Sequence, residues 1–204
     1  MKSIAETKFD KVVKLGFHEI LKPLGFKKKA NNFYSQRNDI GHIINLQKSS
    51  YYSKEHIHFT INTGVFLPEY WLAFCNFFNR PVPNYPTEPE CILRMRIGEL
   101  RKENDKWYDV TNESDEGDLI RQMNENLNEY ILPHFGHTLS KDMLLEGLDQ
   151  QALRATPLEK LIVFGELGEK AKAKREFEKL ITETTRNPGF LETLKEYGKK
   201  YGLI

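Results

Sequence analysis

Polar side chains that could hold a ligand recur at alternate positions of the chain. They are interleaved with apolar residues such as Ile44, Phe59 and Met95. If the apolar residues face a core, strict alternation places the polar ones together on the opposite face of a sheet. Amide, hydroxyl, imidazole and guanidinium groups on one surface could recognise a carboxylate or phosphate, because Arg binds such groups with two parallel hydrogen bonds. The candidate ligand-binding residues are Asn45, Gln47, Ser49, His58, Thr60, Asn62, Arg94 and Arg96.

The same pattern allows two other interpretations. An antiparallel sheet often presents Asn, Gln and Thr to water, and Arg often pairs with neighbouring acids without any ligand. Alternatively, a small hydrolase or transferase could use His58 as acid or base while Arg94 and Arg96 hold an anionic substrate. We favour a non-enzymatic binding module that recognises a protein or a small anionic ligand, and we assign no catalytic residue.

Histidines offer a weaker signal for a metal. His56 and His58 are two apart on a predicted strand, so they share a face and could supply two ligands, with His42 as a further candidate. No acidic residue or cysteine at a recognisable spacing supplies a third ligand, so we expect no metal site. The sequence also lacks the glycine motifs of nucleotide-binding proteins and the hydrolase and zinc-protease signatures. No cofactor is therefore expected.

Composition narrows the class of protein. The chain has 204 residues, of which 39% are hydrophobic, and 30 Lys and Arg against 29 Asp and Glu give a net charge of +1. This balance is typical of a globular protein and argues against a nucleic-acid partner. No segment resembles a signal peptide or membrane span, and Cys75 and Cys91 are too few for a disulfide framework. We therefore expect a cytoplasmic protein with no membrane partner, and its oligomeric state stays open.

The spacing of apolar residues predicts the elements that position these side chains. A helix is expected over residues 9–24, followed by strands near 33–37, 42–49 and 56–66. A nearly buried helix is expected over 68–79, then a proline-rich loop over 80–90, strands over 91–97 and 106–110, and a helix to about 132. This order predicts an α+β domain over residues 1–139, with an antiparallel sheet of about five strands and helices packed on one face.

The remaining residues, 140–204, predict helices only. Thr156, Pro157 and Glu159 combine an N-cap, a proline at the first helical position and a capping-box partner. Apolar residues at helical spacing continue to residue 197. We expect a helical extension packed on the first domain.

The strand segments as a set resemble a known family. The runs GFKKKANNFY, INLQKSSY, HFTINTGVF, RMRIGEL and WYDV are similar to those of the bacterial family catalogued as domain of unknown function 4304. The resemblance covers roughly residues 9–132. It implies an α+β domain of bacterial origin and supplies no catalytic residues to carry over.

Overall fold

An antiparallel sheet forms the centre of the molecule. The computed structural model describes residues 2–51, 53–76, 78–184 and 187–204. Its strands are β1 (Lys27–Lys29), β2 (Asn32–Arg37), β3 (Ile40–Lys48), β4 (His56–Phe66), β5 (Leu93–Arg96) and β6 (Tyr108–Thr111). The first five pair in chain order, and β6 also pairs with β4. The sheet thus has six strands where about five were expected, and its antiparallel character is confirmed.

Strand β4 is long enough to hold two partners on the same side. Its C-terminal half pairs with β5, from Asn62 to Val65, and its N-terminal half pairs with β6, from His56 to Phe59. Between β5 and β6 the chain leaves the sheet through the short helix α4 (Ile97–Leu100) and a loop. This excursion brings residues 101–107 beside the sheet without adding to its hydrogen-bonded ladder.

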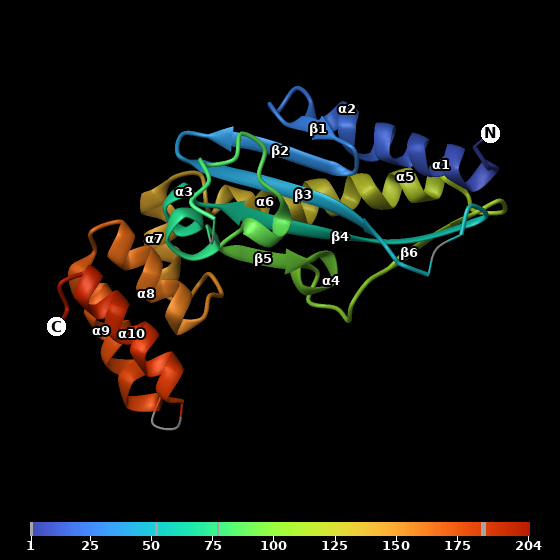
Figure 1. Cartoon of the computed structure of the whole chain (residues 1–204). Coiled ribbons are helices and arrows are strands. Elements are labelled where there is room, and N and C mark those ends of the chain that lie inside the picture. Colours follow the sequence, from blue (N-terminus) through green and yellow to red (C-terminus); the bar gives the residue numbers. More distant parts are fainter. Residues whose placement is uncertain (1, 52, 77, 185–186) are drawn as a thin grey trace.

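Helices cover one face of the sheet, as predicted (Figure 1). They are α1 (Ile4–Val13), α2 (Glu19–Leu21), α5 (Glu116–Glu125) and α6 (Leu132–Gly136), with π-helical turns η1 (Lys14–His18) and η4 (Asn126–Ile131). A capping box at Ser3 and Glu6 starts α1. Phe9 of α1 packs edge-to-face on Phe59 of β4, with ring centroids 5.2 Å apart. The apolar alternation of the strands therefore meets the apolar stripe of the helices in one core.

The opposite face is partly covered by residues 80–90, the proline-rich segment. This segment is preceded by helix α3 (Pro68–Tyr70) and the π-helical turn η2 (Trp71–Cys75). It ends with the 3-10 turn η3 (Glu88–Glu90). A second, smaller apolar cluster forms here from Tyr34, Ile43, Phe66, Trp71 and Cys91. The helix predicted over 68–79 ends at Cys75, and residue 77 lies outside the described residues. The expectation of near-complete burial was wrong, because Leu72 is 50% and Phe78 75% exposed.

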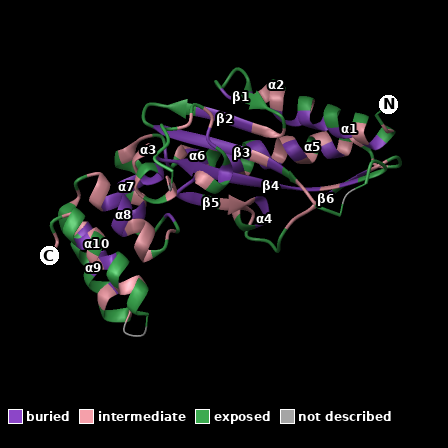
Figure 2. Cartoon of the chain, viewed as in Figure 1, coloured by how far each residue is buried: buried purple, intermediate pink, exposed green. Residues whose placement is uncertain are grey.

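The chain after residue 139 is helical, as predicted. It forms α7 (Lys141–Asp149), α8 (Pro157–Glu166), α9 (Lys170–Glu183) and α10 (Pro188–Lys200), which gather at the end of the sheet away from the N-terminus (Figure 1). Buried residues run without interruption from the sheet into these helices, as Figure 2 shows by colour. Lys141 also bonds Glu69, with Nζ 2.6 Å from Oε1. Among the described residues, no helix combines the length and apolar content needed to cross a bilayer.

Candidate functional site

The eight residues predicted to form a ligand-binding surface do lie on one face of the sheet. Register places Asn45 opposite Asn62, Gln47 opposite Thr60, and Asn62 opposite Arg96. The amide of Ser49 bonds the carbonyl of His58 at 2.8 Å, which extends the same alignment beyond β3. All eight point away from α1 and α5 because their sequence neighbours point toward those helices. We call this set, Asn45, Gln47, Ser49, His58, Thr60, Asn62, Arg94 and Arg96, the polar sheet surface.

Hydrogen bonds within the polar sheet surface satisfy several of its groups. Asn62 Nδ2 donates to Asn45 Oδ1 at 3.1 Å and to Gln47 Oε1 at 2.8 Å, and Asn45 Nδ2 donates to Asn32 Oδ1 at 2.7 Å. Thr60 is fully buried, and its hydroxyl donates to the carbonyl oxygen of Lys106 at 2.7 Å. These amides and this hydroxyl hold neighbouring strands and a loop together.

Both arginines are paired with carboxylates. Arg94 makes two bonds to Glu88, at 2.6 and 3.2 Å, and these bonds raise the pKa of its guanidinium. Arg96 Nη1 donates to Asp105 Oδ2 at 2.6 Å. A hollow of about 460 Å³ opens beside them, lined by Gln47, Asn62, Glu88, Arg94, Met95, Arg96, Glu99, Glu103 and Asp105. Four carboxylates against two guanidinium groups leave the lining with an excess of two negative charges.

Trp107, in the loop before β6, joins the polar sheet surface although its position in the sequence did not suggest it. Its ring stacks on His58, with centroids 4.7 Å apart and planes 6° from parallel. Its Nε1 donates to Asp105 Oδ2 at 2.9 Å, and Arg96 lies 5.6 Å from the ring centroid. Trp107 therefore connects the imidazole of His58 to the ion pair of Arg96.

The histidines separate into different environments. His56 and His58 share a face as expected, and Asp109 of β6 lies directly opposite His58. Asp109 is the third group that the sequence spacing did not reveal. His42 is not near them: it lies on the helix-covered face, opposite Val65, because its position in β3 alternates with Asn45. Its ring stacks on Phe135 instead, with centroids 4.4 Å apart.

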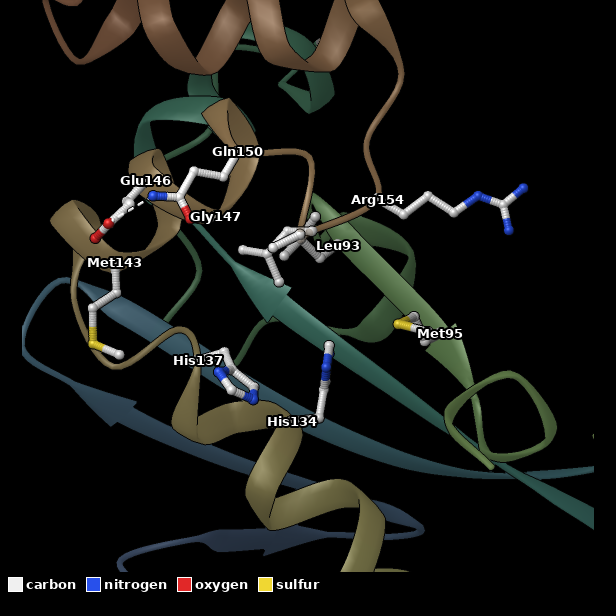
Figure 3. A pocket seen from close by; sticks show the side chains of 11 residues that line it. Leu93, Met95, His134, His137, Met143, Glu146, Gly147, Gln150 and Arg154 are labelled. Carbon is white, nitrogen blue, oxygen red and sulfur yellow. Dashed lines mark hydrogen bonds between the residues drawn. The ribbon is translucent and has the colours of Figure 1, made fainter. Parts of the chain in front are cut away.

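A second concave region lies elsewhere in the molecule. A cavity of about 390 Å³ opens where β5, the end of α6 and the segment following α7 meet (Figure 3). We call it the β5–α7 cavity. Its lining residues are Leu93, Met95, His134, His137, Met143, Glu146, Gly147, Gln150, Ala152, Leu153 and Arg154.

The β5–α7 cavity combines an apolar interior with a polar rim. Leu93 and Leu153 are buried, whereas Glu146 and Gln150 are exposed and bonded to each other at 2.8 Å. Figure 3 shows His134, in α6, and His137, at its C-terminal end, on the side of the helix that faces β5 and α7. Burial, and secondly the neighbouring His137, lower the pKa of His134, which favours its neutral imidazole.

Sequence reasoning could not find the β5–α7 cavity because its lining comes from four separate segments. Each of its residues has an ordinary structural use: Leu93 and Met95 belong to an alternating strand, and Leu153 to a helical extension. His134 and His137 are three residues apart, and this spacing fits the end of a helix as well as a binding site.

Comparison with known proteins gives one match. A family model described as a domain of unknown function, DUF4304, matches residues 17–137, which is more than half of the chain. The match includes every strand, the polar sheet surface, and His134 and His137 of the β5–α7 cavity. It ends before α7. Neither the curated proteins nor the solved structures gave a match.

Proposed function

This chain belongs to the DUF4304 family, whose description assigns no activity, and we propose from its own geometry that it is a binding protein for a small molecule. The site is the β5–α7 cavity. The observation that carries this proposal is a volume of about 390 Å³ with an apolar interior and a few polar groups at its rim. Small-molecule sites are typically concave, mostly apolar and about 300–1,000 Å³ in volume.

The position of the β5–α7 cavity supports the same function. One wall comes from the part of the chain that matches the family, through Leu93, Met95 and His134, and the other comes from α7 and the segment after it. Ligand sites are frequent where two structural units meet, because such junctions leave concave space. The helical extension therefore completes the site.

The lining defines the class of ligand. Leu93, Met95 and Leu153 would contact an apolar body, which is favourable by about 25 cal/mol for each Å² of apolar surface buried. His134, held neutral by its surroundings, can donate or accept one hydrogen bond. We infer a small amphipathic molecule with an apolar body and one uncharged hydrogen-bonding group.

The enzyme alternative has less support. It requires Arg94 and Arg96 to hold an anionic substrate, and both guanidinium groups are bonded to carboxylates. His58 bonds Asp109 and is not among the residues that line the hollow beside the arginines. This arrangement favours binding over catalysis on the polar sheet surface.

Filling the β5–α7 cavity tests the proposed function. Ala152 is exposed and lines the cavity, so Ala152→Trp should occupy its volume without disturbing the core. The neutral dye N-phenyl-1-naphthylamine, which fluoresces in apolar sites, should bind the native protein, and the variant should bind it about tenfold or more weakly. Ala171→Trp, at an exposed position of α9, is the matched control and should bind like the native protein. Equal dye binding by all three proteins would contradict the proposal.

The polar sheet surface supports a second candidate function, recognition of a protein partner. Carboxylates outnumber guanidinium groups in the lining of the hollow, which favours a basic segment over the anionic ligand expected from the sequence. Such a segment would compete with Arg101 and Lys106 for Glu103 and with Arg154 for Glu99. A lysine-rich peptide should bind, and Glu99→Gln with Glu103→Gln should weaken it, whereas Glu55→Gln with Glu113→Gln should not. Preferential binding of a glutamate-rich peptide of equal length would support the anionic ligand instead.

The setting of this protein is also part of the proposal. We propose a bacterial, cytoplasmic protein, consistent with the two free cysteines, Cys75 and Cys91. Burial raises the pKa of the Cys91 thiol well above its usual range, which keeps it protonated and unreactive.

A further inference from the structure

Three potential metal ligands converge at the outer end of the polar sheet surface. His56 Nε2 lies 2.5 Å from Asp109 Oδ1, and His58 Nδ1 lies 2.8 Å from the same oxygen. All three ligand atoms lie within 4.8 Å of one another. They form the only such group of three or more histidine, cysteine or acidic side chains within the described part of the chain.

The backbone fixes this cluster. His56 and His58 alternate along β4 and so share a face, and Asp109 is the register partner of His58 on β6. Residues directly opposite on neighbouring antiparallel strands have Cβ atoms about 4.5–5.5 Å apart, which suits two ligands of one ion. The ring of Trp107 lies flat on His58 and restricts the orientation of this imidazole. Strand pairing thus holds His58 and Asp109 opposite each other, and stacking on Trp107 also holds His58.

The donor set selects a class of metal ion. Two imidazole nitrogens and one carboxylate oxygen suit Zn²⁺, Co²⁺ or Ni²⁺, whereas Mg²⁺ and Ca²⁺ prefer oxygen ligands throughout. Ligand atoms about 2.1 Å from a tetrahedral ion lie roughly 3.4 Å apart. The present separations of 2.5 and 2.8 Å would therefore widen by less than about 1 Å, which small side-chain rotations allow.

We propose that His56, His58 and Asp109 bind one divalent transition-metal ion, with Zn²⁺ as the best fit, on the outer face of the sheet. Three protein ligands leave a fourth position of the ion open to water or to a group on a partner. The side chains of His56 and Asp109 are each 55% exposed, so an ion can reach the cluster from solvent. This site is separate from the β5–α7 cavity, and neither proposal depends on the other.

The charge state of Asp109 agrees with this role. Partial burial alone would raise the pKa of its carboxyl, but the hydrogen bonds from His56 and His58 outweigh burial and lower it. The carboxyl is therefore ionised, as a metal ligand must be. Without an ion, both imidazoles direct a nitrogen at one oxygen, and an ion would replace the protons that those bonds use.

The test measures Zn²⁺ binding to the untagged full-length protein by isothermal titration calorimetry at pH 7.5. The native protein should bind Zn²⁺ in a 1:1 complex, and His56→Asn and Asp109→Asn should each weaken binding about tenfold or more. Glu178→Gln, which removes an exposed carboxylate outside the cluster and the β5–α7 cavity, is the matched control and should bind like the native protein. Mg²⁺ and Ca²⁺ should give no heat of binding.

Trp107 provides a second, local readout. Co²⁺ bound at His58 should quench the fluorescence of the ring stacked 4.7 Å away, and Asp109→Asn should shift this quenching to at least tenfold higher Co²⁺. Circular dichroism checks that both variants fold. If Asp109→Asn disturbs the pairing of β4 with β6, His56→Asn decides the question, because it leaves β6 unchanged. Absence of Zn²⁺ binding, or equal binding by native protein and His56→Asn, would overturn the proposal.

Discussion

At the scale of single residues, His42 is a titratable group buried in the core. Its Nε2 lies 3.0 Å from both the carbonyl oxygen and the hydroxyl of Thr138, and its ring lies against Phe135. Burial, opposed by the hydrogen bond to Thr138, lowers the pKa of His42 to about 4. The folded protein therefore holds this imidazole neutral at pH values where an unfolded chain would protonate it.

This difference predicts an acid-sensitive contribution to stability. An unfolded histidine titrates near pH 6.5, so between pH 6.5 and 4 the unfolded chain binds a proton that the folded chain excludes. The contribution is fully present above pH 6.5 and is lost as the pH falls toward 4. We expect the unfolding free energy to fall by about 3 kcal/mol from this group alone between pH 7 and 4, measured by urea denaturation.

A variant separates this effect from the titration of carboxylates. His42→Gln retains a side-chain donor for Thr138 and removes the titrating group. Its stability should decline less steeply with acid than that of the native protein, by about the 3 kcal/mol attributed to His42. Parallel declines for the two proteins would show that His42 does not titrate as described.

At the scale of elements, alternation in the sequence predicts which residues share a face but not what lies opposite them. The eight residues of the polar sheet surface could be grouped correctly because β3, β4 and β5 each alternate strictly. Their partners Glu88, Asp105 and Trp107 come from a single 3-10 turn and from a loop, which are too short to show any periodicity. The sequence therefore predicted on which face of the sheet Arg94 and Arg96 lie. It could not predict that carboxylates pair with both guanidinium groups.

The position of β6 shows the same limit. A short strand near residue 108 could be predicted, but β5 and β6 both pair with β4, on its two halves. Which half of β4 each strand pairs with depends on the length and path of residues 97–107, and tertiary packing determines that path. Asp109 consequently reaches His56 and His58 through a pairing that no local pattern specifies.

The helix predicted over 68–79 fails for a different reason. Its residues of helical spacing form one apolar face that further aromatic residues widen, a pattern typical of a nearly buried helix. The helix instead ends at Cys75, and Phe78 beyond it is exposed. Within the helix Leu72 faces solvent while Trp71 packs beneath the proline-rich segment. The high aromatic content of this helix predicted that it would be buried. The neighbouring proline-rich segment covers only part of it.

At the scale of the whole molecule, we propose that residues 140–204 pack on residues 1–139 as part of one cooperative unit. Leu161 of α8 is fully buried within the same continuous core as Phe59 of β4. Tyr197 of α10 also donates a hydrogen bond to the carbonyl of Ala73 at 3.3 Å. The extension should then stabilise the sheet, not merely follow it in sequence.

The substitution Leu161→Ala tests this coupling. It should reduce the unfolding free energy by about 3 kcal/mol, because it leaves a cavity in the shared core. Trp71 lies in η2, which contacts α8, so the readout is Trp107 alone, in a Trp71→Phe background, because Trp107 lies beside β6 in the first part of the chain. The midpoint of that signal should shift to lower urea in the variant and stay unchanged in the surface control Glu178→Ala. An unshifted midpoint for Leu161→Ala would mean that the extension unfolds independently.

The central claim, that the β5–α7 cavity binds a small molecule, can be observed directly at its methionines. The chain has four methionines, and Met95 and Met143 line the cavity while Met123 is buried in the core. We would label the methionine methyl groups with ¹³C and titrate the native protein with a set of small, uncharged amphipathic compounds. The account predicts saturable shifts of the Met95 and Met143 signals, with the Met123 signal unchanged. Shifts confined to Met123, or no saturable shift with any compound, would contradict it.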